Sequence, residues 1–499
     1  MHAGPPDRFT WRHCLQVLSR QAAVVLLFPS LTAHAATIEV SPGEDWCAVV
    51  NGADPGDEIV LGSGDHLGPC DITSASVTVR GEPASVVYSG SSSNVIDINA
   101  SDVTLLDLHF GPTHANIDAI KIKSGDRTQV EGCFFTQIGG ISISANTSDS
   151  DGIVISGNTF TDLQATGIYL GCHSGAGSCA ATDFRFEDNL IDGVTSSGVG
   201  YGIEVKVDSW GVLADNVIHN AQGPAIHIFG STTDGSVSVV ERNYLVDSRV
   251  NNTLEIGGGP AVVRNNIVSG NPNYALYVYD YGSRGITRDV QIVGNTFDGE
   301  VGLASGIWAA GLGHELQDNA TTVSAIEPTS GIPMDGNVFC EGSCWTGDYW
   351  PIDGGLLTLS GVSTDLDDDF CGTSRTDPPH VGALQRSGLT GPTLAIDFKS
   401  TFGCEGDTDT DTDADSDTDT DTDTDTDTDT DTDTDTDTDT DSDTDADGSS
   451  SDALDTGDTT GPKTGCGCFT SPAPGIGAMS WLCLVGVTRR RRNSRPRQA

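Results

Sequence analysis

Asparagine recurs in the turns between strand-like stretches, and this repeat constrains the fold more than any other feature of the chain. A short alternating stretch ends in an Asn-x-apolar turn, and another short alternating stretch follows each turn. Most successive turns start 22 to 31 residues apart. The motif occurs as GNTF (Gly157–Phe160), DNLI (Asp188–Ile191), DNVI (Asp215–Ile218), RNYL (Arg242–Leu245), RNNI (Arg264–Ile267), GNTF (Gly294–Phe297) and GNVF (Gly336–Phe339).

Repeats of this length, made only of short strands and Gly/Asn turns, predict an all-β parallel β-helix. One rung cannot bury its own apolar face, whereas stacked rungs bury it continuously. We expect the recurring Asn to adopt the tight left-handed bend and to pair with the Asn of the next rung. An antiparallel sandwich or a propeller is the rival fold, but the chain has no hairpin dipeptides at regular spacing.

In these repeats the chain resembles the right-handed parallel β-helix (pectin-lyase-like) superfamily, over roughly Ile38 to Leu384. The segment DDDFCGTSRTDPPHVGAL also resembles the end of many such repeat proteins. The resemblance implies a single-stranded right-handed β-helix. It also implies an outer parallel strand that serves as a binding groove, as in the polysaccharide lyases and hydrolases of this superfamily.

The two ends of the chain are expected to lie outside this fold. Residues 1–36 have the order of a secretory signal peptide: arginines, a short apolar run, and a small-residue cleavage site near Ala35 or Ala36. Residues 407–462 are a nearly pure Asp-Thr linker, which cannot bury enough apolar area to fold and is expected to be disordered. The β-helix domain is therefore predicted to span residues 37–406.

The last segment, residues 463–499, contains a Cys motif (Cys466 and Cys468), a weakly apolar stretch from Phe469 to Thr488 and the cluster Arg489–Arg492. It resembles the C-terminal surface-sorting signals of myxobacterial and related exported proteins. The resemblance implies export and display at the cell surface or outer membrane, with sorting machinery as a partner. A simple membrane anchor is the alternative, and the sequence leaves open whether the segment is retained or cleaved and the protein released.

The charge of the chain excludes one class of partner. The net charge is −48, and removal of the signal segment, the linker and the tail leaves about −33 on the predicted domain. A nucleic acid is not expected as a partner because its phosphates require Lys and Arg. A polysaccharide or cell-surface glycan is expected, bound by a monomer. Ca²⁺ is the one cofactor that the sequence admits, at the carboxylates of STDLDDDF (Ser363–Phe370) or along the linker.

The cysteines agree with export, because disulfides form in oxidising compartments. Two local pairs in loop-like sequence are predicted as disulfides, Cys172–Cys179 and Cys340–Cys344, with metal binding as the rival. Cys47–Cys70 and Cys371–Cys404 are candidates to staple the two ends of the domain. Cys133 is left over and is expected to pack as a small buried hydrophobe.

Alternate residues of a strand face opposite sides of a sheet, and this rule predicts two outward columns. Alignment of the strands gives an inward set: Ile120, Ile141, Ile168, Ile203, Ile226, Leu254, Leu276 and Ile307. The first outward column then reads Asp97, Lys121, Ser142, Tyr169, Glu204, His227, Glu255, Tyr277 and Trp308. The second, two residues further on, reads Asn99, Lys123, Ser144, Gly171, Lys206, Phe229, Gly257, Tyr279 and Ala310.

The middle of these columns concentrates titratable groups between aromatic rings, a composition that suits a sugar chain because aromatic faces stack on sugar rings. The catalytic candidates are Glu204, Glu255, His227 and Lys206, and the substrate-binding candidates are Tyr169, Phe229, Tyr277, Tyr279 and Trp308. Rungs about 4.8 Å apart place the backbones of Glu204 and Glu255 about 9.6 Å apart. Inverting glycosidases hold their carboxyls roughly 6.5–9.5 Å apart, so this chemistry is permitted, with His227 between the two.

A polysaccharide lyase is the less favoured enzyme. It would use Lys206 as base and would need Arg or Ca²⁺ to neutralise the substrate carboxylate. The alginate and chondroitin lyases of the superfamily carry Lys and Arg on successive rungs, whereas the rung after Lys206 reads AIHIFG and neither column contains Arg. The segment YDYGSRG (Tyr279–Gly285) could wall the groove, with Arg284 or Arg288 as the missing cation.

A protein without catalytic activity is the main alternative. Outward positions of a sheet are polar by default, and Glu204 with Lys121 or Lys206 would then be an ordinary ion pair across rungs. Such a domain would be a structural or adhesive surface rod. The sequence leaves open whether the chain is an enzyme, which glycan it meets and whether Ca²⁺ binds.

Overall fold

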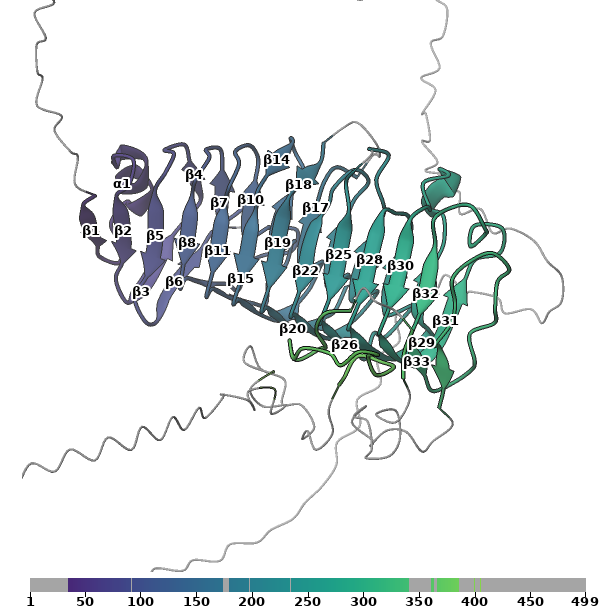
Figure 1. Cartoon of the computed structure of the whole chain (residues 1–499). Coiled ribbons are helices and arrows are strands. Elements are labelled where there is room, and N and C mark those ends of the chain that lie inside the picture. Colours follow the sequence, from purple (N-terminus) through teal and green to yellow (C-terminus); the bar gives the residue numbers. More distant parts are fainter. Residues whose placement is uncertain are drawn as a thin grey trace, which may run out of the picture. The chain divides into compact units, whose positions relative to one another are not determined.

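The computed structural model describes residues 35–90, 92–173, 179–196, 198–233, 235–340, 360–362 and 366–385, together with Lys399 and Cys404. These residues form a right-handed parallel β-helix in which short strands stack rung upon rung (Figure 1). All pairings between named strands are parallel, and the two antiparallel bridges near the C-terminal end lie outside these strands. The predicted fold class is therefore confirmed.

Three ladders of strands form the faces of the β-helix. The first face is a 12-stranded sheet, and the second and third faces are two ladders that the long strands β29 and β31 join into one 20-stranded sheet. The first face contains β1 (Thr37–Val40), β2 (Glu58–Leu61), β5 (Thr78–Gly81), β8 (Thr104–Leu106), β11 (Gln129–Glu131), β15 (Val154–Ser156), β19 (Phe184–Glu187), β22 (Gly211–Ala214), β25 (Ser238–Glu241), β28 (Ala261–Arg264), β30 (Val290–Val293) and β32 (Glu315–Gln317).

The other two faces are also built from short strands, apart from the longer β29 and β31. The second face contains β3 (Gly64–Leu67), β6 (Ser85–Tyr88), β9 (His109–Phe110), β12 (Phe134–Thr136), β16 (Thr159–Leu163), β20 (Leu190–Val194), β23 (Val217–Ala221), β26 (Tyr244–Val246), β29 (Ile267–Val278), β31 (Thr296–Leu303), β33 (Ala320–Thr321) and β34 (Val338–Phe339). The third face contains β4 (Cys70–Ile72), β7 (Ile96–Ile98), β10 (Ile120–Ile122), β13 (Ile143–Ala145), β17 (Ile168–Leu170), β21 (Ile203–Val205), β24 (Ile226–Ile228), β27 (Leu254–Ile256) and the later parts of β29 and β31. A small pair, β14 (Ser150–Asp151) and β18 (Ala181–Thr182), lies beside them.

The predicted asparagine ladder runs through the turns between the first and second faces. Each ladder Asn accepts hydrogen bonds on its Oδ1 from the preceding ladder residue; Asn243, for example, accepts from the backbone N and the Nδ2 of Asn216, both at 3.0 Å. Its own Nδ2 donates to the Leu213 carbonyl at 2.8 Å and to the Asn266 Oδ1 at 3.0 Å. The ladder comprises Asn158, Asn189, Asn216, Asn243, Asn266, Asn295, Asn319 and Asn337.

Two details of the predicted turn are wrong. The left-handed residue is the one before each ladder Asn, such as Asp188 (φ 56°), Asp215 (φ 59°) and Gly294 (φ 66°). Gly, Asp and Asn tolerate this conformation best, which explains the first letter of most of the motifs. In RNNI the ladder residue is the second asparagine, Asn266, because Asn265 takes the left-handed position (φ 56°).

The core consists of inward columns of aliphatic and aromatic side chains. Phe110, Phe135 and Phe160 stack in successive rungs, with ring centroids 4.9 and 4.5 Å apart. Cys133 is a free thiol and is buried, as predicted, and burial raises its pKa to about 12. Its backbone N–H donates to the Asn158 Oδ1 at 2.9 Å, so Cys133 occupies the ladder position in a rung that lacks the Asn.

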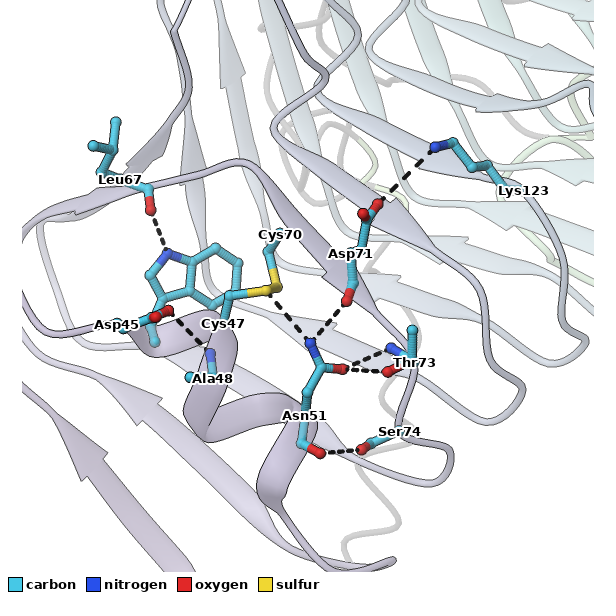
Figure 2. The surroundings of a disulfide bond; sticks show 11 residues. Asp45, Cys47, Ala48, Asn51, Leu67, Cys70, Asp71, Thr73, Ser74 and Lys123 are labelled. Atoms are coloured by element: carbon cyan, nitrogen blue, oxygen red, sulfur yellow. Dashed lines mark hydrogen bonds and ion pairs between the residues drawn. A yellow bond between two sulfur atoms is a disulfide. The ribbon is translucent and has the colours of Figure 1, made fainter.

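The N-terminal end of the core is covered by α1 (Trp46–Gly52), which buries Trp46 and Val50. Figure 2 shows how this helix is fixed: Cys47 forms a disulfide with Cys70, and Asn51 bonds the strand that carries Cys70. The Asn51 Nδ2 donates to the Asp71 carbonyl at 2.8 Å, and its Oδ1 accepts from the Thr73 backbone N at 2.7 Å. The Asn51 side chain therefore bonds backbone groups of β4 and of Thr73 at the edge of the third face. Without it these groups would be open to pairing with another strand.

The closing segment, residues 366–385, covers the outward side of the second face. Its Phe370, Ala383 and Leu384 pack on outward apolar residues of the second face, which are Leu190, Val217, Tyr244, Val246 and Ile267. The partly buried Arg375 holds the segment in shape by donating to the carbonyls of Asp368, His380 and Gly382 at 2.7, 2.8 and 2.8 Å. Figure 1 draws this segment in green.

Three of the expected disulfides are present: Cys47–Cys70, Cys172–Cys179 and Cys371–Cys404. The fourth expected pair includes Cys344, which lies outside the described residues. The predicted signal peptide apart from its last two residues, the linker and the C-terminal segment with Cys466 and Cys468 lie outside them too. Within the described part of the chain, no helix is long and apolar enough to cross a membrane.

The ladder predicts a large loss of stability when one of its asparagine side chains is removed. Replacement of Asn243 by Ala would leave the buried N–H groups of Asn216 and the Leu213 carbonyl without their partners, so we expect Asn243→Ala to lower the free energy of unfolding by about 3 kcal/mol or more. Urea denaturation followed by circular dichroism measures this change. The exposed Asn99 provides the matched control, and Asn99→Ala is expected to change stability by no more than about 0.5 kcal/mol. Equal effects of the two substitutions would contradict a stabilising ladder.

Candidate functional site

The predicted outward column is present in the middle rungs of the third face. Tyr169 pairs in register with Glu204, Glu204 with His227, His227 with Glu255, and Glu255 with Tyr277. Their neighbours Ile168, Ile203, Ile226, Leu254 and Leu276 are completely buried in the core. The two glutamates therefore lie two rungs apart on one face, with His227 between them.

The second column follows from backbone hydrogen bonds. The backbone N–H groups of Lys206, Phe229 and Tyr279 each donate to a carbonyl of the preceding rung at 2.9 Å. Gly171 and Gly257 stand in the same column, and their lack of side chains leaves room for neighbours. A Cβ on Gly257 would lie 2.9 Å from the Tyr281 Cβ, so the glycine permits this tyrosine to approach.

The predicted column is wrong at both of its outer parts. Ile120 pairs with Ile143 and Lys121 with Ser144, so Ser144 rather than Ser142 stands in the first column. At the other end, Tyr277 pairs with Gly302 because a loop separates β31 from Trp308. Trp308 is instead buried in the core, with its ring stacked on His314 at a centroid distance of 4.4 Å. The structure thus separates Trp308 from the other substrate-binding candidates.

The four catalytic candidates are buried rather than spread along an open strip. The exposed fractions are 4% for Glu204, 4% for Lys206, 2% for His227 and 9% for Glu255. We call these four residues the polar cluster. In this conformation a substrate could reach none of them without a movement of their neighbours.

Glu204 and Lys206 form a buried ion pair, with the Lys206 Nζ hydrogen-bonded to the Glu204 Oε1. The ammonium also lies over the Phe229 ring, 4.0 Å from its centroid, and 5.0 Å from that of Tyr169. Burial raises the pKa of Glu204, and the charge of Lys206 acts in the opposite direction. The two aromatic rings and the Glu204 carboxylate together replace the hydration shell of the Lys206 ammonium.

His227 and Glu255 belong to a second hydrogen-bonded group. The Tyr279 hydroxyl lies 3.0 Å from the His227 Nε2 and donates to the Glu255 Oε2 at 3.4 Å, while the Asn252 Nδ2 donates to the Glu255 Oε1 at 2.6 Å. Burial raises the pKa of Glu255, and burial together with the charge of Lys206 lowers the pKa of His227 well below its ordinary value. His227 is therefore a neutral imidazole at neutral pH.

Aromatic rings cover the polar cluster. Phe229 stacks on His227 at 4.0 Å, Tyr201 lies 5.5 Å from it, and Tyr281 contacts both His227 and Phe229 at 6.1 and 4.1 Å between centroids. Tyr281 begins the 3-10 helix η1 (Tyr281–Ser283), in the segment predicted to wall the groove. Arg284 of this segment lies over the Tyr281 ring at 5.4 Å, whereas Arg288 has an ion pair with Asp289 at 3.6 Å.

Sequence reasoning missed Tyr201 and Asn252, because both lie just before their strands and outside the aligned columns. Tyr201 is two residues before Ile203 and Asn252 is two before Leu254. Each of them lies three residues before a glutamate of the polar cluster, Tyr201 before Glu204 and Asn252 before Glu255. At this spacing a bend in the chain brings the side chain over the outward glutamate, and this spacing is the signal that could have found them.

The described residues contain no group of three or more His, Cys, Asp or Glu that could hold a metal ion. Asp369, in the stretch considered for Ca²⁺, accepts hydrogen bonds from the backbone N–H groups of Cys371, Thr373 and Gln385 at 2.9 Å. Its carboxylate therefore shapes the closing segment.

The neutral His227 predicts a pH dependence of stability. The imidazole takes up a proton in the unfolded chain near its ordinary pKa and in the folded chain only at lower pH, so its contribution is present above about pH 6.5 and is lost as the pH falls below it. We expect wild type to lose stability faster than His227→Gln below about pH 6.5, with a difference in slope of at most about 1.4 kcal/mol per pH unit. Urea denaturation at a series of pH values measures both slopes.

An exposed imidazole provides the control for this experiment. His114 is exposed, and His114→Gln is expected to keep the wild-type slope. Identical slopes for wild type and His227→Gln would show that burial does not lower the pKa of His227 in the folded chain.

Comparisons with known proteins agree with this fold. The model of the family "Right handed beta helix region" matches residues 175–328, which is less than half of the chain. A search of curated proteins found no match. The chain is 13% identical to the PL6 family alginate lyase AlyGC, with a TM-score of 0.42, over 72% of this chain and 60% of that one.

Two further solved structures are similar to the same degree. Pectate lyase Pel9A is 13% identical with a TM-score of 0.37, over 72% of this chain and 96% of that one. The catalytic unit of a GH87 α-1,3-glucanase from Streptomyces thermodiastaticus is 17% identical with a TM-score of 0.36, over 61% and 69%. All three TM-scores are below 0.5, so these likenesses carry no argument about activity, which has to come from the residues themselves.

Proposed function

We propose that the β-helix domain binds a polysaccharide across the tyrosines of the third face, and that the polar cluster below them holds their rings in place. The observation that carries this proposal is the gathering of tyrosines. Of the eight tyrosines that the structure describes, six lie at this one place: Tyr169, Tyr201, Tyr274, Tyr277, Tyr279 and Tyr281. All of them except Tyr169 are partly exposed.

We call these six residues the tyrosine surface, because several of their rings stack on one another in a regular arrangement. Tyr274 and Tyr277 stack at 5.1 Å between centroids, and Tyr277 and Tyr279 at 5.2 Å. Gly302 of the next rung leaves space for these rings, since a Cβ there would lie 2.7 Å from Tyr277 and 2.8 Å from Tyr274. Rings with an apolar face and a hydroxyl suit a sugar chain, which presents apolar ring faces between hydroxyls.

In this proposal the polar cluster positions the aromatic rings that lie over it. The Tyr279 hydroxyl is tied to His227 and Glu255, and Lys206 lies against the rings of Tyr169 and Phe229. A closed cluster whose groups bond to one another has no open position next to its carboxylates for a scissile bond and a water. Inverting hydrolysis by Glu204 and Glu255 would require displacement of the aromatic rings that cover the polar cluster.

The same closure favours a second candidate function, a rod without ligands. A β-helix whose outward charges are buried and paired is rigid and needs no substrate to explain them. The two candidates differ in whether the tyrosine surface binds anything.

Polysaccharide binding by the full chain distinguishes these functions. On an array of neutral and acidic polysaccharides we expect retention of at least one glycan. We expect Tyr277→Ala and Tyr281→Ala each to weaken it about tenfold, the effect of losing about 1.4 kcal/mol of stacking. Tyr88→Ala, a partly exposed tyrosine in β6, is the matched control and should bind like wild type.

Each contrary result has a meaning. No binding to any glycan, or undiminished binding by both variants, would favour the rod. Release of reducing ends that disappears in Glu204→Gln would show that the polar cluster is catalytic and that its positioning role is wrong.

We also propose that the protein is exported and displayed at the cell surface, where the tyrosine surface would meet extracellular glycans. The basic, apolar and small-residue order of residues 1–36 and the Cys, apolar and Arg order of residues 463–499 support this proposal. N-terminal sequencing of the surface fraction should give a chain that begins at Ala36 or Thr37. A chain that retains Met1 and stays inside the cell would contradict it.

A further inference from the structure

A pocket of about 560 Å³ lies at the other end of the β-helix, away from the tyrosine surface. It is formed where β5, β8 and β11 of the first face turn into β6, β9 and β12 of the second face. Figure 1 labels β5, β6, β8 and β11 of these strands. The turn after β5, residues 82–84, has one residue more than the turns after β8 and β11, which are 107–108 and 132–133. The longer turn forms a wall beside the outward side chains of the next two rungs.

An aromatic ring forms the floor of this pocket. Phe134 is 50% exposed although it lies in a paired strand, and His109 of the preceding rung faces it edge-on at 6.3 Å between centroids. Further along the same column, Leu190, Val217 and Tyr244 are covered by the closing segment. The described closing segment contacts Leu190 and the rungs beyond it, and Phe134 remains accessible.

Polar groups without partners surround the ring. Among the described residues, neither the Asp107 carboxylate nor the His109 imidazole has a side-chain hydrogen bond or ion pair. Glu82 uses one carboxylate oxygen for the Arg80 Nη1, at 3.4 Å. Arg80 is also held by Glu58 at 2.9 Å. The pocket therefore offers carboxylate oxygens and an imidazole as free hydrogen-bonding groups.

The charge of the pocket selects among ligands. The single guanidinium of Arg80 is paired with two carboxylates, and the Asp107 carboxylate is unpaired. An anionic ligand would meet net negative charge here, which disfavours uronates and phosphates. A neutral ring with hydroxyl donors matches both the carboxylates and the aromatic floor.

A peptide strand is a poor occupant of this pocket. Strand addition requires a free sheet edge, whereas β6, β9 and β12 are each paired on both sides, with β3 and β16 beyond them. The volume also falls within the 300–1,000 Å³ of small-molecule sites.

We propose that this pocket is a second carbohydrate site, which binds neutral sugar units by stacking on Phe134 and by hydrogen bonds to Asp107, Glu82 and His109. The proposal rests on the pocket alone and does not depend on binding at the tyrosine surface.

Saturation-transfer NMR with the full chain tests the proposal, with cellotetraose, laminaritetraose, mannotetraose and xylotetraose as neutral probes and tetragalacturonate as the acidic probe. We expect at least one neutral probe to bind and tetragalacturonate not to compete with it. Phe134→Ala and Asp107→Asn are each expected to raise the dissociation constant about tenfold, equivalent to about 1.4 kcal/mol. Both side chains are exposed, so neither substitution should unfold the chain.

Two controls separate the pocket from other surfaces. Leu67→Ala removes another exposed apolar side chain of the second face, 61% exposed, and should leave binding unchanged. Tyr281→Ala disables the tyrosine surface, so binding of a neutral probe that persists in this variant, and that is weakened when Phe134→Ala is added to it, belongs to the pocket. The proposal is overturned if no neutral probe binds, if Phe134→Ala leaves the dissociation constant unchanged in the Tyr281→Ala background, or if Leu67→Ala raises it as much as Phe134→Ala does. Binding that depends on Tyr281 but not on Phe134 would support the tyrosine surface and refute the pocket.

Discussion

The asparagine ladder is the interaction on which the rest of the structure depends. From Asn158 onward, each turn between the first and second faces buries backbone groups that no strand partner can reach, and the ladder amides bond them instead. Asn216, Asn243 and Asn266 each bond the rung before and the rung after. Because every amide is both donor and acceptor, the ladder fixes the register of successive rungs and thereby lines up their side chains on the outer faces.

That alignment has an energetic consequence on the third face. It brings Glu204, His227 and Glu255 into one column on three successive rungs, where titratable side chains would ordinarily be solvated. The structure buries them instead, by pairing Glu204 with Lys206 and by tying Glu255 to Asn252 and Tyr279. Buried charges are costly unless they are paired, so the aromatic cover and the polar cluster depend on each other. The tyrosine surface above is the part that remains available to a ligand.

The sequence predicted the fold and the middle of the site well, because both follow from periodicity. Alternation placed Tyr169, Glu204, His227, Glu255 and Tyr277 outward, and pairing confirms each of them. Predictions failed where the periodicity is interrupted. Ser142 and Trp308 follow turns of unusual length, so counting from the preceding motif gave the wrong rung position. Asn265 and Asn266 are adjacent, and only the left-handed conformation of the first decides which of them enters the ladder.

The sequence by itself determined that short strands stack in parallel, that Asn and Gly lie in the turns, and which cysteines could pair near each end of the domain. These properties depend on local conformation and on spacing along the chain. Tertiary structure alone decided that the polar cluster is closed and that the pocket at Phe134 is open. Exposure depends on which distant segment folds over a face: Tyr281 covers His227, and Phe370 covers the column that continues from Phe134. No local pattern encodes those contacts, because each joins segments far apart in the sequence.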